Sequence, residues 1–328
     1  MVAIIFVAVL VLLFPLFFPW YYITELMVSF LPYITAICMI FAAVSFVHLR
    51  KKMKPGYRSP TQRYFRGVSF LVFCILFFWY SKQFNRFYEP PVQNVEVAQT
   101  GNLKILFANI HKDNVDYEGI KKTIADNNPD MLMFVEFADH HYENLKDFLQ
   151  KNYPYTNNVS RSKTFVGSMV FSKYPLTNKA DDFPQWARRY GYFSLPYEWQ
   201  QIYFYLVHTS SPDSYEHFVM RNEQLETFVQ DFKNHESDRQ HDNILVVGDF
   251  NVTPRSPYYD ILDASFSGEM DNATKNLPFL TTRKLKQFPL AQAHIDHLWT
   301  TPSLDVQGLQ AIAMPGSDHK AFLFTMGL

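Results

Sequence analysis

Two patterns of hydrophobic and polar residues divide this chain. Residues 1–90 contain three long apolar runs, at 2–18, 26–49 and 67–80. A helix that crosses a bilayer needs about 20 mainly apolar residues. We therefore predict about three transmembrane helices within residues 1–88. Two alternatives stay open, because the first run could be a cleaved signal peptide and the third a buried core helix.

The loop between the second and third runs predicts how these helices are oriented. It is rich in Lys and Arg and contains no acidic residue, and such short basic loops stay on the cytoplasmic side of a membrane. Three crossings would then place the chain from residue 85 onward outside the cytoplasm. The basic residues of the loop are Arg50, Lys51, Lys52, Lys54, Arg58, Arg63 and Arg66.

A change of pattern follows the third run. Residues 89–102 are mostly polar, include Pro90 and Pro91, and are expected to be a linker. Residues 103–328 are enough for one substantial hydrophobic core, so we expect a single domain there.

Short apolar strands alternate with amphipathic helices in this second part of the chain. Such alternation is typical of a layered α/β fold. The expected strands cover 103–110, 131–135, 166–171, 202–207, 244–247, 295–299 and 321–324, and the expected helices cover 116–127, 140–150 and 216–232.

Composition and charge exclude several classes of protein. The chain is 48% hydrophobic and 17% aromatic, which argues against disorder. Its only cysteines, Cys38 and Cys74, lie in apolar runs, so neither a disulfide scaffold nor a cysteine-ligated zinc site is expected. Up to residue 100 there are 9 Lys and Arg against 3 Asp and Glu, which leaves 21 against 28 in the remainder. That remainder has a balance of −7, which argues against a general nucleic-acid binder.

Polar side chains cluster at the ends of the expected strands. Because strand ends of a layered α/β domain meet at one rim, these side chains can lie close together. Carboxylate and amide oxygens suit a hard cation such as Mg²⁺, and the imidazoles remain for proton transfer. Each element alone also has a purely structural interpretation, as a tight turn, a helix cap or a structural Asp-His pair. The set comprises Asn109, Glu136, His208, Asp249, Asn251, Asp296, His297, Asp318 and His319.

In this order along the chain, the motifs resemble the endonuclease/exonuclease/phosphatase superfamily, which has the deoxyribonuclease I-like fold. The resemblance runs from about residue 101 to the C-terminus. The three-helix front end resembles a bacterial subgroup that includes membrane proteins linked to glycopeptide resistance. The matching segments are residues 103–109, 129–136, 167–175 and 207–209, Gly248-Asp249-Phe250-Asn251, Ile295-Asp296-His297 and Ser317-Asp318-His319.

The resemblance implies a four-layer sandwich of two packed β-sheets flanked by helices, and a metal site. Glu136 would be the main ligand of Mg²⁺, with Mn²⁺ as an alternative metal. Asn109 would help Glu136, and Asp318 would assist at the metal.

The resemblance also implies catalytic roles for five residues. Asp249 and Asn251 would position the attacking water or a phosphoryl oxygen. His319 would be the general base, oriented by Asp296. His208 would form hydrogen bonds with the phosphoryl oxygens.

These observations favour a membrane-anchored, Mg²⁺-dependent phosphoesterase. It would hydrolyse a phosphate ester or pyrophosphate outside the cytoplasm, at a bacterial cell membrane, using water activated by the Asp296–His319 pair. A tether to the bilayer makes a lipid-linked substrate a natural candidate. The alternatives are an extracytoplasmic nuclease, which the charge disfavours, and a non-catalytic, membrane-tethered binding module.

Three other features keep two interpretations each. Arg221 and Gln224 either support the rim of the site or form the solvated face of a helix. The aromatic run at 186–199, which includes Arg189, either contacts lipid head groups or packs as a hairpin. His111, two residues after Asn109, either touches substrate or is structural.

Overall fold

The computed structural model describes two compact units. One comprises residues 1–89 with 254–257, and the other residues 90–253 with 258–328. The first unit contains helix α2 (Tyr22–Ser29). The described residues are 20–30 and scattered positions between 14 and 78, then 102–156, 166–178, 189–197, 200–237, 243–266, 268–277, 280–285 and 291–327.

The apolar segments of the first unit were expected to be membrane helices. Among the described residues, no helix combines the length and the apolar character that a membrane crossing requires. The three segments at 2–18, 26–49 and 67–80 lie in part outside the described residues, and the expected linker lies outside them except for Asn102.

The second unit contains two six-stranded mixed sheets. In the first sheet the strand order is β13-β14-β1-β2-β4-β3, with β1 parallel to β2 and antiparallel to β14. Its strands are β1 (Asn102–Asn109), β2 (Met131–Ala138), β3 (Tyr155–Thr156), β4 (Val166–Ser172), β13 (Asp305–Ala313) and β14 (Lys320–Gly327).

The second sheet has the order β5-β6-β7-β8-β12-β9. Strands β6 and β7 form a hairpin, which confirms the hairpin interpretation of the aromatic run for residues 190–197. Its strands are β5 (Thr177–Asn178), β6 (Tyr190–Tyr197), β7 (Gln200–His208), β8 (Ile244–Asp249), β9 (Asp271–Asn272) and β12 (Asp296–Thr300), and a separate small sheet pairs β10 (Arg283–Lys284) with β11 (Gln292–Ala293).

Alternation along β1 explains how the sheets pack. Leu103, Ile105 and Phe107 belong to the core between the two sheets. Leu106 and Ala108 belong to a second core that includes apolar residues of the covering helices. Both faces of the strand are therefore buried, which is why its sequence is an almost continuous apolar run.

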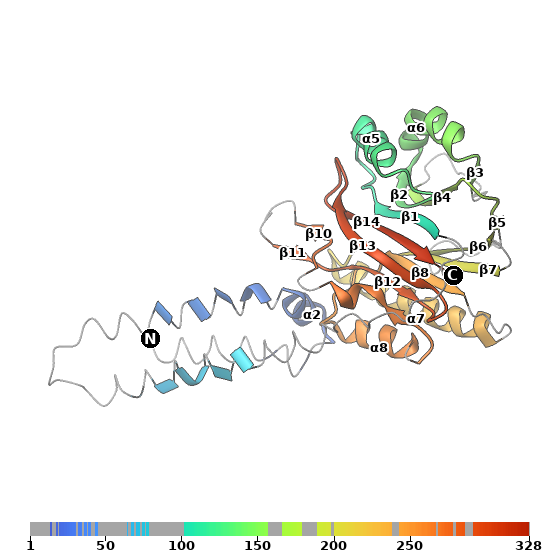
Figure 1. Ribbon diagram of the computed structural model, residues 1–328. Helices are drawn as coiled ribbons and strands as arrows, with labels where there is room; N and C mark the ends of the chain where they lie inside the picture. The colour runs from blue at the N-terminus through green and yellow to red at the C-terminus, as the bar shows by residue number, and fades with distance from the viewer. Residues whose placement is uncertain are drawn as a thin grey trace. The chain divides into compact units, whose positions relative to one another are not determined.

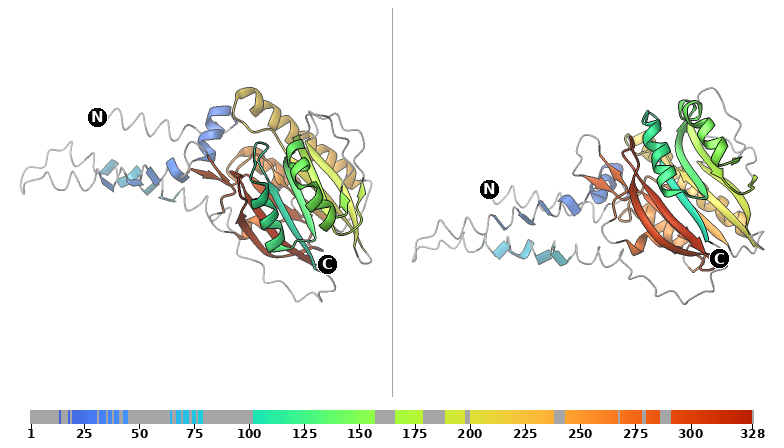
Figure 2. Two further views of the ribbon diagram at one scale, coloured as in Figure 1. Left: turned by 90° about the horizontal axis from the view of Figure 1, so that it is seen from above. Right: turned by 45° about the horizontal axis from the view of Figure 1, so that its top comes forward.

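Helices cover the outer faces of both sheets (Figure 1). Helices α5 (Tyr117–Asn127) and α6 (Asp139–Asn152) lie over the first sheet, and α7 (Tyr215–Ser237) and α8 (Pro257–Phe266) over the second. Figure 2 shows these layers from two other sides. The predicted α/β sandwich of two packed sheets with flanking helices is confirmed. A short 3₁₀ helix (Ala273–Asn276), α8 and β13 were not predicted from the sequence.

Candidate active site

Asn109, the last residue of β1, joins the two sheets at the site. Its Nδ2 donates to Glu136 Oε1 at 2.9 Å and to Asp249 Oδ2 at 3.0 Å. Its Oδ1 accepts from the His111 backbone N–H at 3.0 Å. Asn109 was expected to help ligate a metal, but here its oxygen is engaged and its amide nitrogen faces the carboxylates. In this arrangement it orients two carboxylates from different sheets toward one point.

Glu136 does not end its strand, as the sequence suggested, because β2 continues to Ala138. A register shift between Phe134 and Phe137 interrupts the pairing of β2 with β4, and Glu136 has φ 55°. Such strained backbone is common at functional sites. Glu136 Oε2 accepts from the Lys112 backbone N–H at 2.9 Å. Burial alone would raise the pKa of Glu136, but His208 and these hydrogen bonds outweigh it and lower the pKa to about 2.

Asp249 ends β8, directly after a glycine that allows a close strand approach. A Cβ on Gly248 would lie 2.0 Å from the Val207 carbonyl oxygen of β7. The parallel register places Asp249 beside His208 at the end of β7. Asp249 Oδ1 accepts from the Asn251 backbone N–H at 3.0 Å. Burial, together with the nearby Asp296 carboxylate, raises the pKa of Asp249 to about 7.

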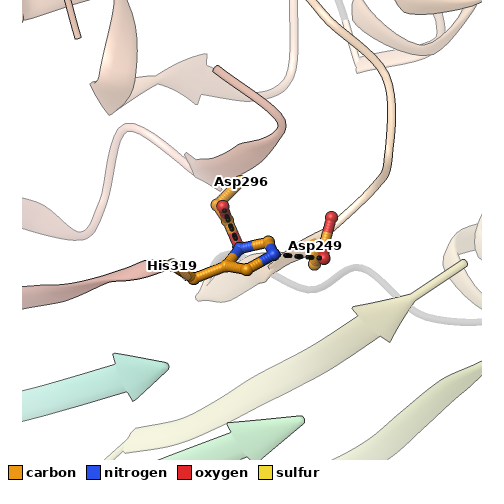
Figure 3. A group of neighbouring side chains, drawn as sticks. All are labelled: Asp249, Asp296 and His319. Atoms are coloured by element: carbon orange, nitrogen blue, oxygen red, sulfur yellow. Dashed lines mark hydrogen bonds and ion pairs between the residues drawn. The ribbon is translucent and has the colours of Figure 1, made fainter. Parts of the chain in front are cut away.

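His319 lies between two carboxylates, as Figure 3 shows. Its Nδ1 is 3.0 Å from Asp296 Oδ2, and its Nε2 is 3.6 Å from Asp249 Oδ2. Asp296 is the first residue of β12 and pairs in register with Asp249. All three side chains are buried. Burial disfavours the charged imidazole, but Asp296 and Asp249 outweigh it and raise the pKa of His319 to about 9.

His208 ends β7, and its side chain faces Glu136. Its Nε2 is 3.6 Å from Glu136 Oε1. Burial, with the nearby Arg189 charge, lowers the pKa of His208 to about 4. His208 is therefore neutral at pH 7, which suits a hydrogen bond to a phosphoryl oxygen rather than an ion pair.

Asn251 lies in the loop that follows β8 and is held by residues that follow β7 and by helix α7. It has φ 49°, and its Nδ2 donates to the Thr209 carbonyl at 2.9 Å. Arg221 Nη1 donates to the Asn251 carbonyl at 2.8 Å, and Gln224 Oε1 accepts from the Ser210 backbone N–H at 2.8 Å. Arg221 and Gln224 are both buried, so they support the rim of the site instead of forming a solvated face. The Asn251 Oδ1 atom is buried without a hydrogen-bond partner, and it remains as an acceptor.

Asp318 is positioned differently from the other expected metal ligands. Its Oδ2 is 3.4 Å from Arg283 Nε. Among the described contacts, none joins Asp318 to Glu136 or Asn109. Of the three expected ligands, the described contacts therefore join Glu136 and Asn109 but not Asp318.

The remaining histidines of the region have structural partners. His297 is buried, bonds the Val252 carbonyl through Nε2 at 2.9 Å, and has its pKa lowered to about 4 by burial. The His111 Nδ1 atom accepts from the Asp113 backbone N–H at 3.2 Å. Two residues near the site were missed as site candidates, Arg189 and Arg283. The only sequence signal for Arg189 was its place beside the aromatic hairpin.

The donor set fits a divalent cation. Ligand atoms of Asp249, Asp296 and His319 lie within 4.8 Å of one another. Both imidazole nitrogens already face carboxylates, so the oxygen atoms nearer Glu136 are the better ligands for a hard cation. Glu136, whose carboxylate is oriented by the Asn109 amide, is the side chain that would hold it.

Comparisons with known proteins identify the family and the fold. A profile described as "Endonuclease/Exonuclease/phosphatase family" matches residues 106–319. No curated protein shows significant sequence similarity to the chain.

Several solved structures share the fold. D. rerio TDP2 complexed with a single-strand DNA product has 15% identity and a TM-score of 0.55, over 70% of this chain and 100% of that one. The human Nocturnin catalytic domain with a bound sulfate anion has 18% identity and a TM-score of 0.53, over 73% and 98%. A beta toxin structure from Staphylococcus aureus has 17% identity and a TM-score of 0.50, over 68% and 99%.

Proposed function

Because the chain belongs to the endonuclease/exonuclease/phosphatase family, we propose that this site catalyses metal-dependent hydrolysis of a phosphate ester or pyrophosphate. Enzymes of this family break phosphate-ester bonds, so the family gives the reaction class. One observation carries the assignment to these residues. Glu136, Asn109, Asp249, His319 and Asp296 form a continuous series of side-chain contacts that crosses from one sheet to the other.

The protonation of this series indicates how the attacking water loses its proton. His319 was expected to be the general base, but its pKa, raised to about 9 by Asp296 and Asp249, favours the protonated imidazole at pH 7. Asp249, with a pKa of about 7, can accept one. A base works best when its pKa lies near the operating pH. We therefore assign proton acceptance to Asp249, while His319, held by Asp296, remains a cationic donor beside it.

Two other side chains would contact the phosphate. Neutral His208 can donate one hydrogen bond to a phosphoryl oxygen. The Asn251 Oδ1 atom can accept only from a donor such as the attacking water. Asn251 would therefore position water rather than the phosphoryl group.

A bound divalent cation would offset negative charge on the phosphoryl group. Glu136 would hold this cation, with Asn109 fixing the direction of its carboxylate. We propose Mg²⁺, with Mn²⁺ as the alternative, since the set consists of hard oxygen donors.

The test is a screen of phosphate substrates with purified full-length protein, with and without Mg²⁺. Phosphomonoesters, phosphodiesters, pyrophosphates, lipid phosphates and DNA would be compared. Glu136→Gln and His319→Ala should each lose activity by orders of magnitude. Both variants should still unfold cooperatively on heating, as the wild-type protein does. Asp126→Asn, on the exposed face of α5, is the matched control and should keep full activity.

Three outcomes of the screen would contradict parts of this proposal. Efficient cleavage of DNA alone would favour a nuclease. Hydrolysis that Glu136→Gln leaves intact would exclude this site. Substrate binding without any hydrolysis would favour a non-catalytic binding module.

We also propose that the enzyme is tethered to a bacterial cell membrane with its site outside the cytoplasm, and that its substrate is lipid-linked. The apolar runs and the basic loop at 50–66 support this topology. Protease treatment of intact cells should digest the domain after residue 102. Protection of the domain in intact cells, with digestion after lysis, would contradict the topology.

A further inference from the structure

Arg189 lies directly beside the site without belonging to the residue set described above. It precedes β6, and its Nε donates to the His208 carbonyl at 3.1 Å. The His208 backbone N–H donates to the Arg189 carbonyl at 2.8 Å, so side chain and backbone fix the arginine on this strand end. Burial lowers the pKa of the Arg189 guanidinium. The Glu136 carboxylate lies close enough to oppose this effect and favour the charged form. The outer guanidinium nitrogens have no other partner among the described contacts.

Arg283 lies beside Asp318 and His319, at the start of the small β10–β11 sheet. Its Nε is 3.4 Å from Asp318 Oδ2, and its Nη1 donates to Ser211 Oγ at 3.3 Å. Its backbone forms an isolated bridge with His319, which anchors it beside the general acid–base residues. Its side chain is 29% exposed, so part of the guanidinium remains open to solvent.

Charge explains why two arginines are needed there. Four carboxylates, from Glu136, Asp249, Asp296 and Asp318, gather around the site. One divalent cation would leave them with a charge of −2, which repels an incoming dianion. The two guanidinium groups offset that charge, so an incoming dianion is no longer repelled.

Shape points in the same direction. A terminal phosphate has three non-bridging oxygens and a single ester arm, so donors can contact it from two sides. A diester has only two non-bridging oxygens, so it offers fewer acceptors to donors from two arginines. Arginine is well suited to bind phosphate through two parallel hydrogen bonds.

We infer that Arg189 and Arg283 form a two-sided anion clamp, and that the reacting group of the substrate is a terminal phosphate or a pyrophosphate rather than a phosphodiester. This inference rests on the proposed function of the same site. It narrows the substrate to groups that carry two or more negative charges.

The experiment compares Arg189→Gln, Arg189→Lys, Arg283→Gln and Arg283→Lys with the wild-type chain. The substrates are p-nitrophenyl phosphate, inorganic pyrophosphate and bis(p-nitrophenyl) phosphate, all with Mg²⁺. Lys122→Gln, which removes an exposed cation from α5, is the control. The KM and kcat of each variant are divided by the wild-type values on the same substrate. Differences in intrinsic reactivity between substrates then cancel.

Arg189→Gln should raise KM for the monoester by about 10- to 100-fold, the typical effect of losing a charged hydrogen bond. Its effect on the diester should be at least several-fold smaller. Inhibition by inorganic phosphate should weaken by the same factor as the monoester KM. The Lys variants should recover part of the loss, because they keep the positive charge. Arg283→Lys can also keep the ion pair with Asp318, so a loss that remains in this variant comes from phosphate binding and not from that ion pair.

Two results would overturn the clamp. One is an equal loss on monoester and diester in the Gln variants. The other is a wild-type protein that hydrolyses only the diester, in a reaction that depends on Glu136. Both would leave the proposed function standing, whereas hydrolysis unaffected by Glu136→Gln would remove the proposed function itself.

Discussion

Replacing Asp296 by Asn tests whether the buried carboxylate supports the charge on His319. The substitution keeps the size of the side chain and an oxygen that can accept from His319 Nδ1. It removes only the negative charge, which lies 3.0 Å from the imidazole nitrogen. Both side chains are buried, at 0% and 5% exposure. Water therefore has little access to replace the lost interaction.

The magnitude follows from that distance. Two unit charges 3.0 Å apart interact by about 5 kcal/mol at an effective dielectric constant of ~20. Since each ~1.4 kcal/mol is a factor of ten in rate, the largest expected loss of kcat is about 10⁴-fold. Mutational losses of acid–base groups are usually ~10²–10⁴-fold. We therefore expect kcat to fall within that range, with a small change in KM.

The pH dependence gives a second, independent result. The Asp296 charge raises the pKa of His319, so its removal should move the alkaline limb of the pH–kcat profile to lower pH. The assay is Mg²⁺-dependent release of phosphate from the substrate selected by the screen, between pH 5 and 10. Asp126→Asn, the same chemical change in an exposed ion pair on α5, should leave both kcat and the profile unchanged. An Asp296→Asn protein that unfolds normally and retains kcat within a factor of three would refute the reasoning.

Three further predictions concern stability. Gly248→Ala should lower the free energy of unfolding by about 1–3 kcal/mol or more and reduce activity, because the new Cβ would lie 2.0 Å from a backbone oxygen. Gly191→Ala is the control, since its Cβ would have nothing within 4 Å, and urea unfolding should show little change. His297 and His141 have pKa values lowered to about 4 by burial, so the unfolded state binds more protons between pH 6.5 and 4. The free energy of unfolding should therefore fall as the pH falls through that window, and less so in His297→Gln; a flat profile would contradict this. Mg²⁺ at 100 times its Kd should raise the free energy of unfolding by about 2.7 kcal/mol. Glu136→Gln should abolish this increase, and an equal increase in the variant would show that the cation binds elsewhere.

Local patterns in the sequence predicted much of the fold. The strand at 103–110 and the helix at 116–127 correspond to β1 and α5 within a residue or two. The helix starts where Asp116 accepts from the Gly119 backbone N–H, and this capping contact is local in the chain. By contrast, α8 and β13 were missed. The exposure of β13 alternates only irregularly, so its sequence carries no clear period of two.

The composition of the site could also be predicted, because its residues follow apolar strands in a recognisable order. Asn109, His208 and Asp249 lie at strand ends, as expected. Glu136 does not, and its direction depends on a bulge that only the pairing of β2 with β4 reveals.

The sequence by itself determined the alternation of strands and helices, the change at about residue 100, and the types of side chain available for chemistry. These depend on residues close together in the chain, whose spacing sets which face is buried. Only the tertiary structure decided which nitrogen or oxygen atom faces which partner. It therefore decided that two carboxylates raise the pKa of His319, that Asn109 orients carboxylates, and that Arg189 and Arg283 lie beside the site. Those properties arise from burial and from charges that are far apart in sequence, and both exist only once the two sheets have packed together.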